Sequence, residues 1–138
     1  MIALLAAIAL QATSAPPAVD PQVAAAGDQA IQFFAAVSKS ARVLGSCAAF
    51  SEPEALDNLV GSILSLDQFA EIRTEFAEPT RAILAESYAD GQRTPVESGL
   101  NEERCNFLRK ASADEIAGAL PGLQSAIDFA EGRAATPD

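Results

Sequence analysis

Residues 20–50 read "DPQVAAAGDQAIQFFAAVSKSARVLGSCAAF" and open with a helix start. Asp20 can cap a helix, and Pro21 suits the first helical position, where no backbone donor is needed. Apolar or small residues then recur in steps of three and four, the period of an amphipathic helix: Val23, Ala26, Ala30, Phe34, Val37, Ala41, Leu44 and Ala48. The stretch predicts one helix of roughly thirty residues, with Cys47 at the shoulder of its apolar stripe.

The pattern restarts after residue 50. Pro53 interrupts the first helix, and Ser51 with Glu54 has the spacing of a capping box, in which each side chain satisfies a free backbone N–H. The apolar residues that follow keep a helical period, which argues against a strand: Leu56, Leu59, Val60, Ile63 and Leu66. We expect a second helix here.

A third helix is expected from Asp67 to Gly91. Its predicted inner face consists of Phe69, Ile72, Phe76, Thr80, Ile83 and Ser87. Pro79 lies inside this pattern and should kink the helix or restart it near Glu78, because proline lacks the backbone donor. Gly91 is a typical C-terminal stop.

The chain from residue 94 onward predicts further helices. "TPVE" at 94–97 repeats the start signal, with a threonine cap, a proline at the first and a glutamate at the third helical position, although the following Ser98-Gly99 pair could delay the start to Asn101. Residues 112–115 offer another capping box, and Pro121 with Gly122 should separate a last segment from it. Together the segments predict an all-α protein, a small bundle of about five helices.

The composition is that of one small domain. The chain has 138 residues, 49% of them hydrophobic and 20% charged, which is ordinary for a globular domain. Nineteen acidic against nine basic residues give a net charge of −10. Nucleic acid and anionic membrane surfaces are therefore not expected as partners, since both attract cationic proteins. A cationic partner is compatible with this charge, and so is a simple role in solubility.

The N-terminus, "MIALLAAIALQATSA", has the pattern of a secretory signal. Nine consecutive apolar residues, Ile2–Leu10, precede a small-x-small sequence that ends at Ala15, which predicts cleavage after Ala15. The usual basic start is missing. An uncleaved membrane anchor is the alternative, but the apolar run is far shorter than the roughly 20 residues that cross a bilayer.

These features predict the following division of the chain: a signal peptide at 1–15, a linker at 16–19, a single helical domain at 20–131 and a disordered tail at 132–138. After cleavage no transmembrane segment is expected. The predicted location is the periplasm or the secreted fraction.

Export changes the meaning of the two cysteines, Cys47 and Cys105. In an oxidising compartment, two cysteines in a chain predict one disulfide between them. Closing a loop of this size would stabilise the fold by roughly 4 kcal/mol. Two separate buried thiols are the alternative. A redox site is disfavoured, because the chain has neither a Cys-x-x-Cys spacing nor a histidine.

Four carboxylates form the candidate binding face: Asp67, Glu71, Glu75 and Glu78. Their spacing of four, four and three would align them along one side of a single helix. Such a stripe could dock a cationic partner or hold a divalent ion loosely, and the simplest alternative is a solvated polar face. An EF-hand pattern, which would indicate calcium, is not present.

The residue types exclude several chemistries. Without histidine, the chain cannot contain a Ser-His-Asp or Cys-His catalytic group. No glycine-rich phosphate-binding motif occurs, and Lys39 and Lys110 are the only lysines. We therefore expect no catalytic residue, no metal and no cofactor.

The sequence is best interpreted as an exported, non-catalytic helical binding protein whose partner is another exported protein. The acidic charge is compatible with a cationic partner. Two alternatives stay open. One is an acid-responsive periplasmic chaperone, in which protonation of many carboxylates loosens the bundle. The other is an enzyme that uses carboxylates alone, which would need two carboxyl groups of different pKa in one cleft.

Overall fold

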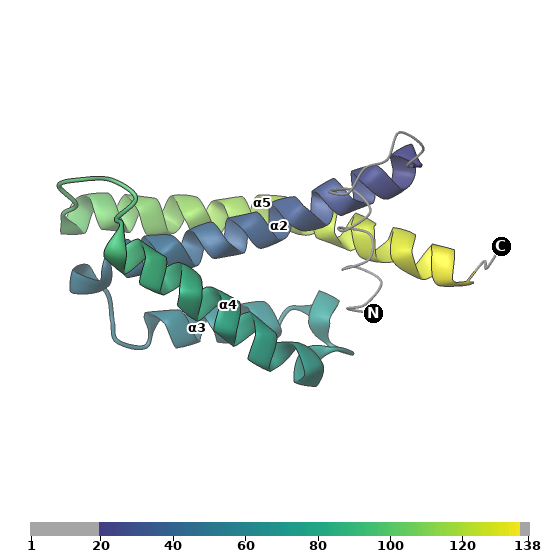
Figure 1. Ribbon diagram of the computed structural model, residues 1–138, viewed down its shortest axis with the longest axis horizontal. Coiled ribbons are helices and arrows are strands. Elements are labelled where there is room, and N and C mark those ends of the chain that lie inside the picture. The colour runs from purple at the N-terminus through teal and green to yellow at the C-terminus, as the bar shows by residue number, and fades with distance from the viewer. Residues whose placement is uncertain (1–19, 136–138) are drawn as a thin grey trace. The chain divides into compact units, whose positions relative to one another are not determined.

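The computed structural model describes residues 20–135, with side chains described as far as residue 132. The predicted signal peptide 1–15, the linker 16–19 and positions 136–138 of the predicted tail lie outside the described residues. Within the described range every regular element is a helix or a 3-10 turn (Figure 1): α2 (Pro21–Ser46), η1 (Ala48–Phe50), α3 (Ala55–Leu64), η2 (Asp67–Phe69), α4 (Arg73–Arg93) and α5 (Glu102–Ala135). The predicted all-α class is confirmed.

The predicted number of helices is wrong, because residues 20–135 form four α-helices and not about five. Helix α5 runs unbroken for 34 residues through Ser112 and Pro121. Ser112 is buried and its hydroxyl donates to the carbonyl of Arg109 at 3.1 Å, so it does not cap a new helix. Pro121 removes one backbone hydrogen bond. Leu123 and Ala126, just beyond Pro121, are buried, and their packing stabilises the continuous helix.

Two helix starts agree with the sequence. The N–H of Gln22 donates to the carboxylate of Asp20 at 2.8 Å, and the N–H of Arg104 donates to the side-chain oxygen of Asn101 at 2.8 Å. Asp20 and Asn101 are therefore caps of α2 and α5. Residues 94–97 lie in the loop before α5 and begin no helix, so the later of the two predicted starts is the right one.

The capping box predicted at Ser51 and Glu54 does not form. No side-chain hydrogen bond caps α3. The hydroxyl of Ser51 instead donates to the carbonyl of Cys47 at 2.9 Å and accepts a hydrogen bond from Arg109 at 2.9 Å. The Ser51 hydroxyl, which the local pattern predicts as a cap of the second helix, thus accepts a hydrogen bond from Arg109, 58 positions later in the chain.

The described chain divides into two compact units, with boundaries inside α2 and α5. The described part of the terminal unit contains Asp20, residues 21–35 of α2 and residues 117–135 of α5. Its buried positions are half alanine and half larger apolar side chains: Val23, Ala26, Ala30, Phe33, Leu123, Ala126, Ile127 and Ala130. The single domain predicted for 20–131 stays a prediction. Helix α5 continues through residues 132–135, which the sequence assigned to a disordered tail.

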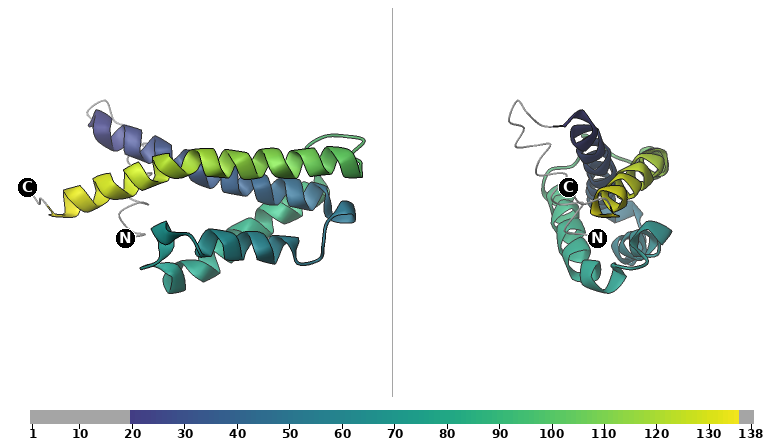
Figure 2. Two further views of the ribbon diagram at one scale, coloured as in Figure 1. Left: turned by 180° about the vertical axis from the view of Figure 1, so that it is seen from behind. Right: turned by 90° about the vertical axis from the view of Figure 1, so that its right-hand side faces the viewer.

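The central unit, residues 36–116, contains α3 and α4 as an antiparallel pair that lies beside this unit's part of α2 (Figures 1 and 2). The rings of Phe69 and Phe76 lie 5.2 Å apart, and Phe69 is fully buried. Helix α4 is continuous from Arg73 to Arg93 with Pro79 inside it, so it does not restart near Glu78. The main apolar side chains buried here are Val37, Ala41, Leu44, Val60, Ile63, Leu64, Phe69, Ile72 and Leu84.

Two glycines bring the backbones of α2 and α4 into direct contact. A methyl group on Gly45 would overlap the carbonyl of Tyr88, and one on Gly91 would overlap the carbonyl of Arg42. Gly91 is buried inside α4, which continues two residues beyond it. The prediction that Gly91 stops the helix is therefore wrong. The absent side chain serves helix packing and not chain termination.

We expect Gly91→Ala to destabilise the protein by about 3 kcal/mol or more, because the methyl group meets backbone atoms that cannot move independently of their helix. Gly61→Ala is the matched control. Gly61 lies in α3, and nothing lies within 4 Å of the position that its methyl group would take, so alanine should stabilise by about 0.5 to 1 kcal/mol. Urea denaturation measures both, and equal stability of the two variants would contradict the close contact.

Candidate functional site

The four carboxylates of the predicted binding face do not share one helix. Asp67 lies in η2 and Glu71 in the turn that follows it, whereas Glu75 and Glu78 belong to α4. All four side chains are exposed. The predicted alignment of the four along a single helix is therefore wrong, because the helix begins only at Arg73.

The late start of α4 follows from the burial of two apolar residues before it. Leu66 has extended backbone angles (φ −63°, ψ 141°) and Ile72 is not helical (φ −116°, ψ 8°). Between them the chain turns so that Phe69 and Ile72 are both buried. The spacing of Phe69, Ile72 and Phe76 also fits a helix, so the local pattern could not reveal this turn.

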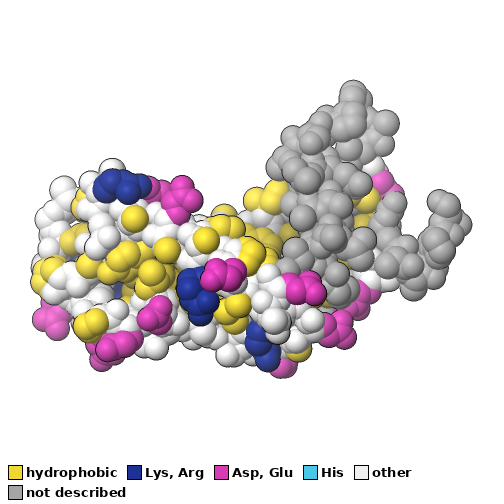
Figure 3. All heavy atoms as spheres, turned by 60° about the horizontal axis from the view of Figure 1, so that its bottom comes forward, with side chains coloured by type: hydrophobic (Ala, Val, Ile, Leu, Met, Phe, Trp, Pro, Cys, Tyr) yellow, Lys and Arg dark blue, Asp and Glu magenta, His cyan; other side chains and the backbone are white. Residues whose placement is uncertain are grey.

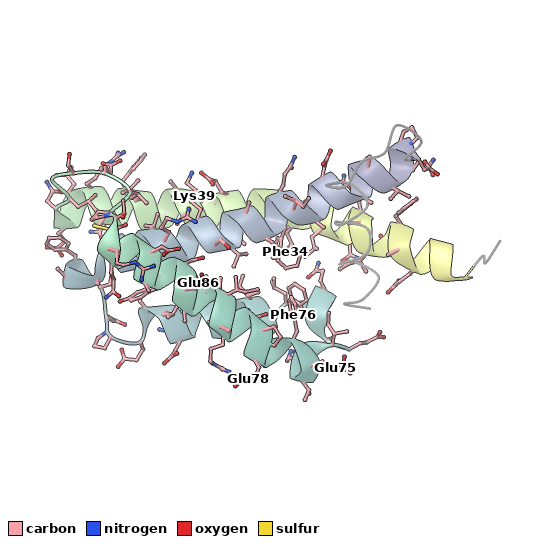
Figure 4. All side chains as sticks on the ribbon, viewed as in Figure 1. Phe34, Lys39, Glu75, Phe76, Glu78 and Glu86 are labelled. Atoms are coloured by element: carbon pink, nitrogen blue, oxygen red, sulfur yellow. A yellow bond between two sulfur atoms is a disulfide. The ribbon has the colours of Figure 1, made fainter. Side chains whose placement is uncertain are left out.

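Helix α4 carries an acidic face that the sequence identified only in part. Glu75, Glu78 and Glu86 are all exposed, and Figure 4 marks their places along α4. At about 100° per residue, Glu86 lies about 20° around the helix from Glu75 and three turns beyond it. We call these three carboxylates the α4 acidic face. Glu86 lies eight residues after Glu78, and the residue halfway between them is Ala82. A run of acidic residues in steps of three and four therefore ends at Glu78, although the helical period places Glu86 on the same face.

The opposite side of α4 faces the interior of the central unit. Its buried positions are Thr80, Leu84, Ser87 and Gly91. The hydroxyl of Thr80 is buried and has no hydrogen-bond partner in the described part of the chain. Burial therefore fixes which side of the helix is exposed, and the α4 acidic face cannot turn inward.

Apolar groups accompany the α4 acidic face. The side chain of Ile83 is 55% exposed, and Pro79 and Ala82 are exposed as well. Figure 3, which brings the lower side of Figure 1 forward, shows acidic side chains with exposed hydrophobic side chains between them. A partner that docks on this face would therefore meet apolar groups as well as charges.

Two of the three arginines of α4 are engaged elsewhere. Arg73 donates to the carbonyls of Leu64 and Leu66 at the end of α3. Arg93 pairs with Asp90 near the end of α4. The third, Arg81, is exposed and lies three residues after Glu78, so it borders the acidic face at that residue. Three carboxylates beside one arginine leave the face with a net negative charge.

The second feature is the disulfide between Cys47 and Cys105, which joins the residue after α2 to the first turns of α5. Their Cα atoms lie 5.8 Å apart and both residues are fully buried. The pairing predicted from the sequence is thus present. The side chains packed around it are Val43, Leu100 and Leu108.

A bidentate ion pair lies close to this disulfide in sequence. Both Nε and Nη2 of Arg104 donate to the carboxylate of Glu97 at 2.7 Å. These hydrogen bonds hold the pKa of Glu97 below its ordinary value and raise the pKa of Arg104. The guanidinium also lies 4.9 Å from the ring centre of Phe107, which is 59% exposed. Glu102 and Glu103 are exposed in the first turn of α5, where their charges complement the helix dipole.

Within the described residues no group of three or more cysteine or carboxylate side chains could hold a metal ion. This includes the four carboxylates of the predicted binding face, for which a loose divalent-ion site is one interpretation of the sequence.

No helix between residues 20 and 135 combines the length and the hydropathy needed to cross a bilayer.

The pH dependence of stability should show the contribution of the Glu97–Arg104 pair. Because the pKa of Glu97 is lowered by folding, the pair stabilises above the unfolded pKa, near 4.5, and this stabilisation is lost as the pH falls through the folded value. We expect Glu97→Gln to lower Tm by about 1 to 3 °C at pH 7, and by progressively less as the pH falls below 4.5. Thermal denaturation measures this, and a pH-independent difference would contradict the assignment.

Comparison with known proteins identifies no relative. No protein-family model matches the chain, and it matches no curated protein and no solved structure. Its function must therefore be inferred from its own residues.

Proposed function

We propose that this chain is an exported, non-catalytic helical binding protein whose α4 acidic face binds a cationic surface on another exported protein. The observation that carries the proposal is the alignment of Glu75, Glu78 and Glu86 on the exposed side of one helix. Glu75 and Glu78 are three residues apart and repel each other by a few tenths of a kcal/mol, while Glu86 extends the negative charge further along the same face. A cationic partner relieves this repulsion.

The length of the α4 acidic face indicates the length of the cationic surface that the partner should present. Eleven residues separate Glu75 from Glu86, which corresponds to about 16 Å along a helix. The partner therefore presents lysine or arginine side chains over a similar length, with an apolar group opposite Ile83. Complementary charge accelerates encounter and selects the partner, while the apolar contact contributes to affinity.

The exposure of the carboxylates supports binding over catalysis. An acid/base enzyme needs two carboxyl groups in one cleft, where different surroundings separate their pKa values. The α4 acidic face offers water-exposed groups on a convex helix surface. Such groups attract charge without the environment that makes a carboxyl group a proton donor at neutral pH.

Export is supported by the disulfide and by the composition of the N-terminus. Disulfides persist mainly in oxidising compartments, and Cys47 and Cys105 are paired. The sequence up to Ala15 has the apolar core and small-residue end of a secretory signal.

Cleavage after Ala15 would leave Pro16 as the first residue of the exported protein. Mass spectrometry of the protein from the periplasmic or secreted fraction, without reductant, should find a chain that starts at Pro16 and lacks two cysteine hydrogens. Recovery of an intact chain from the cytosol alone, starting at Met1, would contradict export.

A hexa-arginine peptide tests the binding face directly. We expect its amide chemical-shift changes in the NMR spectrum to be largest between residues 75 and 86. Affinity should fall at least several-fold as ionic strength rises from about 0.01 to about 0.15 M, because the Debye length shrinks from about 30 to about 8 Å. The triple variant Glu75→Gln, Glu78→Gln, Glu86→Gln should lose most of this binding.

The control removes the same charge from another surface. Glu103, Asp114 and Glu131 are exposed on α5, and their triple replacement by Gln or Asn gives the same net charge. This control should keep the binding. Equal loss in both triple variants, or shift changes spread evenly over all acidic residues, would show that net charge and not the α4 face attracts cations.

With the source organism in hand, cross-linking of the wild-type protein in the exported fraction then identifies the natural partner. The partner should cross-link to α4, and it should disappear with the α4 triple variant and remain with the α5 control. Cross-links confined to other helices would contradict the proposal.

A further inference from the structure

The Cys47–Cys105 disulfide is bordered by two short segments that lie outside the α-helices. One is η1, which directly follows Cys47, and the other is the loop of residues 94–101, which ends four residues before Cys105. In Figure 1 this loop arches from the end of α4 to the start of α5. Since both cysteines are fully buried, a reductant reaches the sulfur atoms only after some covering segment has moved.

The loop 94–101 covers the disulfide through one apolar side chain. Leu100 is half-buried and packs against the cluster that contains both cysteines. The preceding Gly99 has a φ of 69°, a left-handed conformation that glycine adopts without strain. This conformation returns the chain toward the disulfide after the exposed residues 94–96.

Two polar contacts fasten this loop. The N–H of Val96 donates to the hydroxyl of Ser46 at 3.0 Å, and Glu97 accepts both hydrogen bonds from Arg104. Ser46 belongs to α2 and Arg104 to α5, so the loop is tied to both helices that the disulfide joins. The pair is partly open to water, with 44% of the Arg104 and 36% of the Glu97 side chain exposed.

The η1 segment is held differently. Arg109 donates to the hydroxyl of Ser51 at 2.9 Å and to the carbonyl of Phe50 at 3.4 Å. The hydroxyl of Ser51 in turn donates to the carbonyl of Cys47. These contacts bind η1 to the cysteine backbone itself, so η1 has less freedom to move away from the disulfide than the loop has.

We propose that loop 94–101 is a strap that controls access of thiol reductants to the Cys47–Cys105 disulfide. The strap opens locally, when Leu100 leaves the cluster and the Glu97–Arg104 pair separates, while the helices stay folded. Segments with few buried contacts open with much lower free energy than the whole fold. The rate at which the disulfide is reduced is therefore set by the strap and not by global stability. This inference is independent of the α4 acidic face.

The reaction involves a dithiol reductant, supplied by the surroundings. Its thiolate attacks one sulfur of the disulfide, forms a mixed disulfide with that cysteine and expels the other as a thiolate, which takes up a proton. The second thiol of the reductant then attacks the mixed disulfide and releases the first cysteine. The protein gains two thiols and the dithiol becomes a cyclic disulfide. Reduction removes the covalent link between the end of α2 and the start of α5.

The test uses the full exported chain with dithiothreitol at pH 8, with alkylation and mass spectrometry to follow the loss of the disulfide. Glu97→Gln should accelerate reduction about two- to fivefold, as expected from removal of one exposed ion pair that holds the strap. Leu100→Ala, which uncovers the cluster directly, should accelerate it further. Both variants should keep the helical circular dichroism of the wild type.

Two controls distinguish opening of the strap from a charge effect and from movement of η1. Glu103→Gln removes an exposed negative charge in the same region, so it reports any simple repulsion of the anionic thiolate. Ser51→Ala loosens η1 in place of the strap. Neither should change the rate by more than the scatter of repeated measurements. An effect of Glu103→Gln equal to that of Glu97→Gln, or a larger effect of Ser51→Ala, would overturn the proposal.

Urea provides a second criterion. Local opening of a short loop exposes little surface, so the reduction rate of the wild type should depend only weakly on urea below the unfolding transition. If the logarithm of the reduction rate depends on urea as steeply as the equilibrium constant for global unfolding does, the whole fold must open before reduction. That result would also overturn the proposal.

Discussion

The direct contact between the backbones of α2 and α4 is the constraint on which the central unit depends. Gly45 and Gly91 bring the two helices closer than any side chain would permit. Ser46 follows Gly45, and its hydroxyl contacts the carbonyl of Gly91 and the N–H of Val96. Cys47 comes next and bonds to Cys105. Three consecutive residues thus join α2 to α4, to the loop after α4 and to α5.

This arrangement leaves an interior without charge and an acidic exterior. Helix α4 shows both properties on its two sides, with Leu84 and Gly91 buried and Glu75, Glu78 and Glu86 exposed. The tight inner contact orients the outer face. The glycine contact prevents α4 from rotating, so the helix keeps the three glutamates on its exposed side.

The spacing of the residues predicts part of the candidate site correctly and part of it wrongly. Glu75 and Glu78 share one helix face, as their spacing predicts, because both lie in a regular helix where the period applies. The same spacing places Asp67 and Glu71 on that face, but they lie outside α4. The burial of Phe69 and Ile72 goes with a turn there, and burial in the folded protein is not visible in the spacing of the residues. The capping role predicted for Ser51 fails for the same reason, since Arg109 of α5 binds its hydroxyl.

The sequence by itself determined the all-α class, the cap at Asp20 and the pairing of the only two cysteines. The helices and the cap depend on hydrogen bonds between residues close in sequence. The disulfide depends on there being only one way to pair two cysteines. Only the tertiary structure decided that Pro121 lies inside a helix and that Gly91 is a contact and not a stop. Local propensities differ by about 1 to 3 kcal/mol, and the burial of a few apolar side chains supplies as much, so packing decides wherever the two conflict.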